Sequence, residues 1–172
     1  MKKILVTGSS GFIGFHLAKN LSVKNNVLGI DNHNSYYSKT IKKKRLSILK
    51  KKKNFNFCHL NLTNEKKLKK IFKIFKPEIV FHIAGQPGVL YSFKNPNSYK
   101  INNIDATKTL LKLCNNSNVK KFIFASSSSV YGDQKKFPIK ENFSLNPKNY
   151  YAKTKLKAEQ IISNTFKKNQ IK

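Results

Sequence analysis

The stretch Thr7-Gly8-Ser9-Ser10-Gly11-Phe12-Ile13-Gly14 follows the short apolar run Ile4-Leu5-Val6 and leads into a predicted helix, Phe12–Leu21. Glycine permits a tight turn at this point and lets backbone amides approach a pyrophosphate group closely. The N-terminus of the helix adds a partial positive charge that favours an anion. The stretch therefore predicts a strand, a phosphate-binding turn and a helix, which is how a dinucleotide-binding domain begins.

The rest of the chain alternates short apolar runs with longer helical segments. The runs are nearly continuous in apolar residues, as in strands buried on both faces. We expect strands at Ile4–Thr7, Val27–Asp31, Phe55–Leu60, Ile79–Ile83 and Phe122–Ser126. We expect helices at Phe12–Leu21, Ser38–Lys51, Glu65–Phe75, Ser98–Cys114 and Tyr150–Phe166. This alternation predicts an α/β fold with a Rossmann-like, doubly wound parallel sheet.

Length and composition narrow the class of protein. The chain has 172 residues, the size of one domain. No apolar run is long enough to span a membrane, and Ile4-Leu5-Val6 is too short for a signal-peptide core, so we expect a cytoplasmic protein. Cys58 and Cys114 lack metal-ligand spacing, so we expect reduced structural cysteines and no metal site.

The net charge of +28 raises the question of a nucleic-acid partner. Of the 35 basic residues only Arg45 is an arginine, whereas nucleic-acid sites usually rely on the planar arginine fork. The chain is also rich in Asn, Ile and Phe, which AT-rich codons encode together with Lys. Mutational bias is therefore the simpler explanation, and a nucleic-acid partner is disfavoured.

Asp31 ends the predicted second strand, 20 residues after Gly11. A carboxylate in that place accepts hydrogen bonds from the adenosine ribose of a dinucleotide, and it repels a 2′-phosphate. The position therefore predicts NAD rather than NADP. The alternative is a turn cap, because Asp31-Asn32 is also a turn sequence.

The pentad Tyr151-Ala152-Lys153-Thr154-Lys155 places a tyrosine and a lysine four positions apart, on one face of a helix. A phenol is normally protonated at neutral pH, and a nearby cation favours its phenolate. The pair can therefore serve as a general base with its tuning cation. Such pentads also arise by chance in lysine-rich helices. Tyr150 lacks a matching lysine, because position 154 is threonine.

These motifs together resemble the extended short-chain dehydrogenase/reductase superfamily, whose glycine turn reads TGxxGxxG. Further matches follow in order along the chain: His82-Ile83-Ala84-Gly85, Asn102-Asn103-Ile104 and Ser126-Ser127-Ser128-Ser129-Val130-Tyr131-Gly132. The resemblance implies that Ser127, Tyr151 and Lys155 are catalytic. It also implies NAD as the cofactor, bound by Gly8, Gly11, Phe12, Ile13, Gly14, Asp31, Asn32, Asn61, Leu62, Ala84, Gly85, Asn103, Tyr151 and Lys155.

Two stretches resemble the nucleotide-sugar epimerases that act on UDP-glucuronate. They are Asp31-Asn32-His33-Asn34-Ser35-Tyr36-Tyr37, followed by Lys43-Lys44-Arg45-Leu46, and Ala84-Gly85-Gln86-Pro87-Gly88-Val89-Leu90-Tyr91-Ser92. This resemblance implies epimerisation at C4 through a transient 4-keto sugar, with NAD regenerated, and a role in polysaccharide biosynthesis.

The chain differs in three places from the families that it resembles. The related 4,6-dehydratases carry Asp-Glu where this chain has Ser128-Ser129, which disfavours dehydration. Asn61-Leu62 replaces a frequent Asp-Leu near the adenine, and an amide can still bond an adenine amine. Leu90 stands where the glucuronate group often has arginine.

The resembling enzymes continue past Lys172 with strands and a small domain that bind the nucleotide sugar. We therefore expect residues 1–172 to form the NAD-binding domain, with the C-terminal substrate domain absent. A UDP-sugar would bind once such a domain is supplied. The expected assembly is a homodimer through the helices Ser98–Cys114 and Tyr150–Phe166. Two alternatives stay open: a truncated, noncatalytic NAD-binding remnant, and a protein related to the 4,6-dehydratases.

Overall fold

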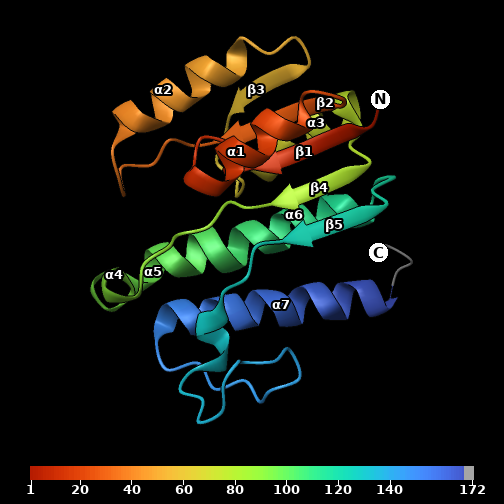
Figure 1. The fold of residues 1–172 in the computed structure, drawn as a ribbon. Coiled ribbons are helices and arrows are strands. Elements are labelled where there is room, and N and C mark those ends of the chain that lie inside the picture. The colour runs from red at the N-terminus through yellow and green to blue at the C-terminus, as the bar shows by residue number, and fades with distance from the viewer. Residues whose placement is uncertain (169–172) are drawn as a thin grey trace.

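The computed structural model describes residues 1–168, and these residues form a parallel sheet of five strands in the order β3-β2-β1-β4-β5 (Figure 1). The strands are β1 (Lys3–Thr7), β2 (Asn26–Asp31), β3 (Phe55–His59), β4 (Ile79–His82) and β5 (Lys121–Phe124). The chain starts in the middle of the sheet, builds outward to β3 and then crosses back to β4. The predicted doubly wound α/β fold is confirmed.

Helices cover the two faces of this sheet (Figure 1). They include α1 (Phe12–Leu21), α2 (Lys39–Lys50), α3 (Glu65–Phe75), α6 (Ala106–Asn115) and α7 (Tyr150–Lys168). Successive residues of a strand point to opposite faces. Accordingly, one core cluster joins β1 to α1 and α2 through Ile4, Val6, Phe15, Ala18, Leu46 and Leu49. The other joins β1 to α3 and α6 through Leu5, Leu68, Phe72, Leu110 and Leu111.

The ends of α3 follow from its sequence. The side chain of Asn64 accepts a hydrogen bond from the amide of Lys67 at 3.0 Å and so caps the first turn. The helix ends at Phe75, and Lys76 adopts a left-handed φ of 51° directly before Pro77. Proline cannot continue a helix, so the bounds predicted for this helix are those observed.

The helix expected at Ser98–Cys114 is built differently. It begins earlier, as α5 (Pro96–Tyr99), because Asn95 caps it by accepting from the amide of Ser98. A π-helical segment (Lys100–Asp105) follows, and α6 completes the run. A π-helical turn inserts an extra residue and re-aims the side chains that it carries. The helix α4 (Val89–Lys94) was not expected.

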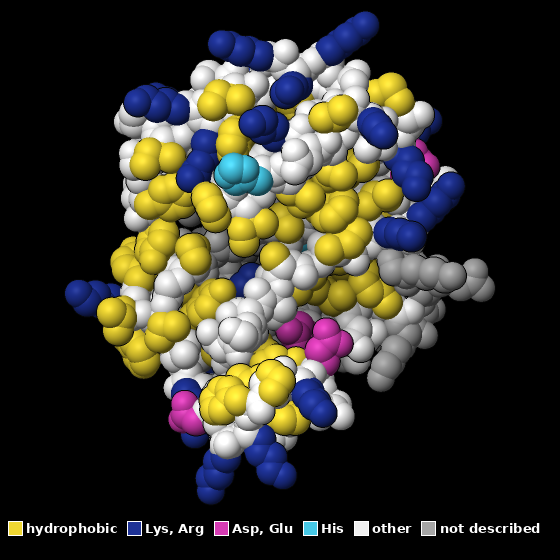
Figure 2. Space-filling model, in the orientation of Figure 1, with side chains coloured by type: hydrophobic (Ala, Val, Ile, Leu, Met, Phe, Trp, Pro, Cys, Tyr) yellow, Lys and Arg dark blue, Asp and Glu magenta, His cyan; other side chains and the backbone are white. Residues whose placement is uncertain are grey.

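One side of the sheet is less covered. Strand β5 pairs with β4, and among the described residues no strand pairs with its other edge. Ile123 lies beside Phe81 in register, on the face that α1 and α2 cover elsewhere, and its side chain is 38% exposed. Figure 2 shows hydrophobic side chains gathered over β4 and β5. We call this area the bare face of β4 and β5.

Candidate functional site

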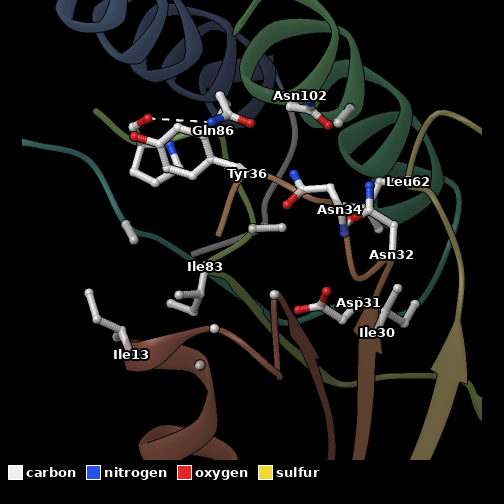
Figure 3. A pocket seen from close by; sticks show the side chains of 18 of the residues that line it. Ile13, Ile30, Asp31, Asn32, Asn34, Tyr36, Leu62, Ile83, Gln86 and Asn102 are labelled. Atoms are coloured by element: carbon white, nitrogen blue, oxygen red, sulfur yellow. Dashed lines mark hydrogen bonds between the residues drawn. The ribbon is translucent and has the colours of Figure 1, made fainter. Parts of the chain in front are cut away.

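A cavity of about 450 Å³ opens along the carboxyl ends of the strands. It lies where the strand order reverses, between β1 and β4, which is where doubly wound sheets bind their ligands. Figure 3 shows Ile13 from α1 and Asp31 from β2 on one side, with Gln86 and Asn102 on the other. Thirteen of the predicted cofactor residues line the cavity: Gly8, Gly11, Phe12, Ile13, Gly14, Asp31, Asn32, Asn61, Leu62, Ala84, Gly85, Tyr151 and Lys155.

The glycine turn leaves no space for side chains. Gly8 has a φ of 70°, and a Cβ there would lie 2.8 Å from the backbone nitrogen of Ala84. A Cβ on Gly14 would collide with the carbonyl of Gly8. No side chain caps the first turn of α1, so its amides are available to an anion in the cavity.

Asp31 ties the glycine turn to the end of β2. Its Oδ2 accepts a hydrogen bond from the amide of Ser10 at 3.0 Å, and its Oδ1 accepts from the amide of His33 at 2.8 Å. The carboxylate is therefore the turn cap that its sequence allowed, and it also lines the cavity. Each carboxylate oxygen can accept a second hydrogen bond, so both functions are compatible.

Two cations of α2 lie at the Asp31 end of the cavity, and sequence reasoning gave neither a role. Lys42 is buried and donates from Nζ to the backbone oxygen and Oδ1 of Asn34, at 2.9 and 2.7 Å. Burial lowers the pKa of Lys42, and the charge of Asp31 opposes that change. Arg45 donates to the hydroxyl of Tyr37 at 3.3 Å. The sequence signal that could have identified Lys42 is its place on the buried stripe of an amphipathic helix, one turn before Leu46.

His82 is fully buried and bridges β1 and α6. Its Nδ1 lies 2.8 Å from Oγ1 of Thr7, and its Nε2 lies 2.9 Å from Oγ1 of Thr107. Thr107 donates its hydroxyl hydrogen to the backbone oxygen of Asn103, so it must accept from Nε2–H, and we infer that Nδ1 accepts from Thr7. Burial lowers the pKa of His82 to about 3, and the charge of Lys155 adds to that effect. His82 is thus neutral, as expected of a packing and hydrogen-bonding residue.

Asn103 is buried behind the cavity wall and is not among its lining residues. Its Oδ1 accepts from the amide of Gln86 at 2.6 Å, and its Nδ2 donates to the backbone oxygen of Gln86 at 3.2 Å. Nδ2 also donates to Oγ1 of Thr154 at 3.0 Å, and Thr154 donates to the backbone oxygen of Tyr151 at 2.7 Å. Asn103 therefore connects the cavity wall to α7.

Helix α7 brings Tyr151 and Lys155 to the cavity. The ring of Tyr151 packs edge-on against Tyr99, with centroids 6.1 Å apart. Lys155 is buried, and its Nζ donates to the backbone oxygen of Ala125 at 2.8 Å. Burial lowers the pKa of Lys155 to about 8, and Glu159 opposes that change.

Ser127 does not line the cavity, although its neighbour Ser126 does. The hydroxyl of Ser127 accepts from the amide of Ser129 at 3.2 Å and caps a short 3₁₀ turn (Ser128–Tyr131). The structure therefore brings Tyr151 and Lys155 together in the cavity, with Ser127 one residue away from its lining. Within residues 1–168, no cluster of His, Cys, Asp or Glu could hold a metal ion. No helix in the same range is long and apolar enough to cross a bilayer.

A glycine turn, an acidic residue at the end of β2 and a cavity at the reversal point define a dinucleotide-binding domain. The model of the NAD dependent epimerase/dehydratase family matches residues 4–172. The chain belongs to this family, whose cofactor is NAD.

Curated relatives agree. The chain is 41% identical over 166 residues to protein CapI of Staphylococcus aureus, and the match covers 95% of this chain and 49% of the relative. It is 40% identical over 164 residues to UDP-glucuronate 4-epimerase of Thermodesulfobacterium geofontis, covering 94% and 50%. The chain thus spans about half the length of these relatives.

Solved structures give the same picture. UDP-glucuronic acid 4-epimerase from Bacillus cereus, in complex with UDP-glucuronic acid and NAD, superposes with a TM-score of 0.92 at 34% sequence identity. The match covers 99% of this chain and 54% of that one. UDP-glucose 4-epimerase from Brucella ovis, in complex with NAD, superposes with a TM-score of 0.87 at 28% identity, covering 100% and 50%.

Proposed function

We propose that this chain is the NAD-binding part of a nucleotide-sugar 4-epimerase of the UDP-glucuronate type. The observation that carries the proposal is that Asp31, at the end of β2, lines the same cavity as Tyr151 and Lys155 from α7. A dinucleotide site and a proton-transferring pair thus share one space. Relatives that act on UDP-glucuronate by name support the substrate class.

The residues present fit NAD. Asp31 would hold the adenosine ribose, and the Gly8–Gly14 turn with the first amides of α1 would hold the pyrophosphate. Asn61 and Leu62 would contact the adenine. Tyr151 and Lys155 line the cavity on the side of β5, so they would lie at the nicotinamide end. NAD supplies, when bound, the acceptor for a hydride from the sugar carbon.

Side chains of α7 would move the proton of the sugar hydroxyl. Tyr151 would take the proton of the sugar hydroxyl, and the cation of Lys155 one helical turn away would stabilise the phenolate. Ser127 would donate a hydrogen bond to the same oxygen, since accepting from the amide of Ser129 does not use its hydroxyl hydrogen. His82 would take no part in proton transfer, because it is fully buried and both its ring nitrogens are held by Thr7 and Thr107.

The noncatalytic NAD-binding remnant is a second candidate, because Ser127 caps a 3₁₀ turn and does not line the cavity. One experiment separates the two. The chain is joined to the C-terminal half of the Thermodesulfobacterium geofontis relative, and NAD binding and conversion of UDP-glucuronate to UDP-galacturonate are measured for the fusion and for the 172-residue chain. Turnover by the fusion supports the epimerase. NAD binding without turnover supports the remnant, and absence of NAD binding by both contradicts the proposal.

A further inference from the structure

The face of α7 that carries Tyr151 and Lys155 continues one turn further to Glu159. The three residues are four positions apart, so they lie one above the other on the helix. Lys155 donates to the backbone oxygen of Ala125, and Glu159 accepts a hydrogen bond from the hydroxyl of Ser126. Two successive residues after β5 are thus held by two successive turns of α7.

Most of the described groups around the Lys155 amine are uncharged, and Glu159 is the negatively charged one. From β4 the lysine faces neutral His82, and from β5 it faces the ring of Phe124, whose centroid lies 4.8 Å from Nζ. On its own helix, Tyr151 lies one turn before it and Glu159 one turn after it, and the charge of Glu159 raises the pKa of Lys155. Among these groups in the described part of the chain, Glu159 supplies the opposing negative charge. Burial otherwise favours the neutral amine.

We propose that Glu159 is a positioning residue that keeps Lys155 protonated in the cavity and fixes Ser126, the residue before Ser127. Lys155 acts as a cation in the proposed function, so the catalytic meaning of this inference rests on that function. The charge of the buried Lys155 amine and the hydrogen bond from Ser126 to Glu159 do not depend on that function.

The two contacts of Glu159 can be separated by substitution. Glu159→Gln keeps an oxygen that can accept from Ser126 and removes the charge that faces Lys155. Ser126→Ala removes the hydrogen bond and keeps the charge. Glu141→Gln removes the same charge from an exposed loop position and serves as the matched control.

The test is a pH titration of Lys155 in the NAD-free chain, followed by NMR with ¹³Cε-labelled lysine. The Lys155 signal is the one that disappears in Lys155→Arg. We expect a wild-type midpoint near 8, a lower midpoint in Glu159→Gln, and wild-type midpoints in Ser126→Ala and Glu141→Gln. A wild-type midpoint in Glu159→Gln, with amide spectra showing an intact fold, would overturn the inference.

NAD affinity measured against pH keeps this inference distinct from the proposed function. The affinities of wild type and Glu159→Gln should agree at pH 6, where both carry a protonated lysine, and differ several-fold at pH 8. If no form binds NAD but the titrations behave as expected, the proposed function fails and the role of Glu159 stands. If NAD binds and the two pH profiles coincide, the role of Glu159 fails alone.

Discussion

Asn103 donates a hydrogen bond from its Nδ2 to Oγ1 of Thr154, 3.0 Å away, although 51 positions separate the two residues. Both side chains are buried. The bond joins the π-helical segment to α7, and Thr154 passes the connection on to the backbone oxygen of Tyr151. The position of the proposed base is therefore fixed from the far side of the cavity wall.

Asn103→Leu should lower the free energy of unfolding by about 3 kcal/mol, because it leaves the amide of Gln86 and the hydroxyl of Thr154 buried with fewer partners. Urea unfolding followed by circular dichroism measures the change. Asn102→Leu is the matched control, since the Asn102 amide donates within its own helical run, to Ser98. Equal losses in the two variants would contradict the role given to Asn103.

The free energy of unfolding should fall as the pH drops from about 6.5 towards 3. His82 has a native pKa of about 3, whereas an unfolded histidine titrates near 6.5. Between these values the unfolded chain binds a proton that the native chain excludes, so acid favours unfolding. His82→Gln should be less stable at pH 7 and show a shallower pH dependence. His16→Gln, on the exposed side of α1, is the control and should retain more stability at pH 7 than His82→Gln.

Asp31→Ala should weaken NAD binding about tenfold or more, because the proposed hydrogen bonds from the ribose hydroxyls to its carboxylate would be lost and the turn at Ser10 would loosen. Discrimination against NADP should relax in the same variant, since the carboxylate no longer repels a 2′-phosphate. Calorimetry with both dinucleotides measures the two effects. Unchanged NAD affinity would refute the assignment.

Tyr151→Phe should abolish most epimerisation in a fusion that carries a relative's C-terminal half, because it removes the phenol oxygen that is proposed to accept the proton. Tyr150→Phe should cost far less, since its neighbour four positions on is Thr154. Initial rates of UDP-galacturonate formation give the comparison. The assignment fails when both variants lose activity equally.

The 172-residue chain alone should show little or no epimerase activity and should self-associate. Uncovered apolar surface and an open strand edge favour pairing with another chain. Ile123→Lys on the bare face of β4 and β5 should shift the sedimentation profile towards monomer. Ile74→Lys, at an exposed position of α3, should leave it unchanged. Robust conversion of UDP-glucuronate by the isolated chain would contradict the first expectation.

Local sequence signals were enough for most of the fold. The apolar runs predicted each described strand to within two residues at either end, and α1 and α3 have the predicted bounds. Glycine and proline set the ends of these elements through backbone restrictions, which act locally. The family motifs likewise identified thirteen residues that line the cavity.

Features that depend on tertiary contact could not be predicted in this way. The π-helical segment carries Asn103, whose partners Gln86 and Thr154 lie far from it in the sequence. Lys42 is buried with its Nζ bonded to Asn34, which lies in the loop before α2. Ser127 matches a motif, but the cavity is lined by Ser126, because the side-chain direction is set by the 3₁₀ turn that Ser127 caps.

Because His82 donates from Nε2 and accepts at Nδ1, the hydrogen bonds on its two sides run in one direction. The amide of Ala84 donates to Thr7, Thr7 to His82, His82 to Thr107, and Thr107 to the backbone of Asn103. Every hydrogen in this series points the same way, and bonds aligned head to tail polarise and strengthen one another. The two ends of the series are fixed, since the amide of Ala84 can only donate and the carbonyl of Asn103 can only accept. The series therefore links, through bonds that strengthen one another, the strand that precedes the glycine turn to the helical run that holds α7.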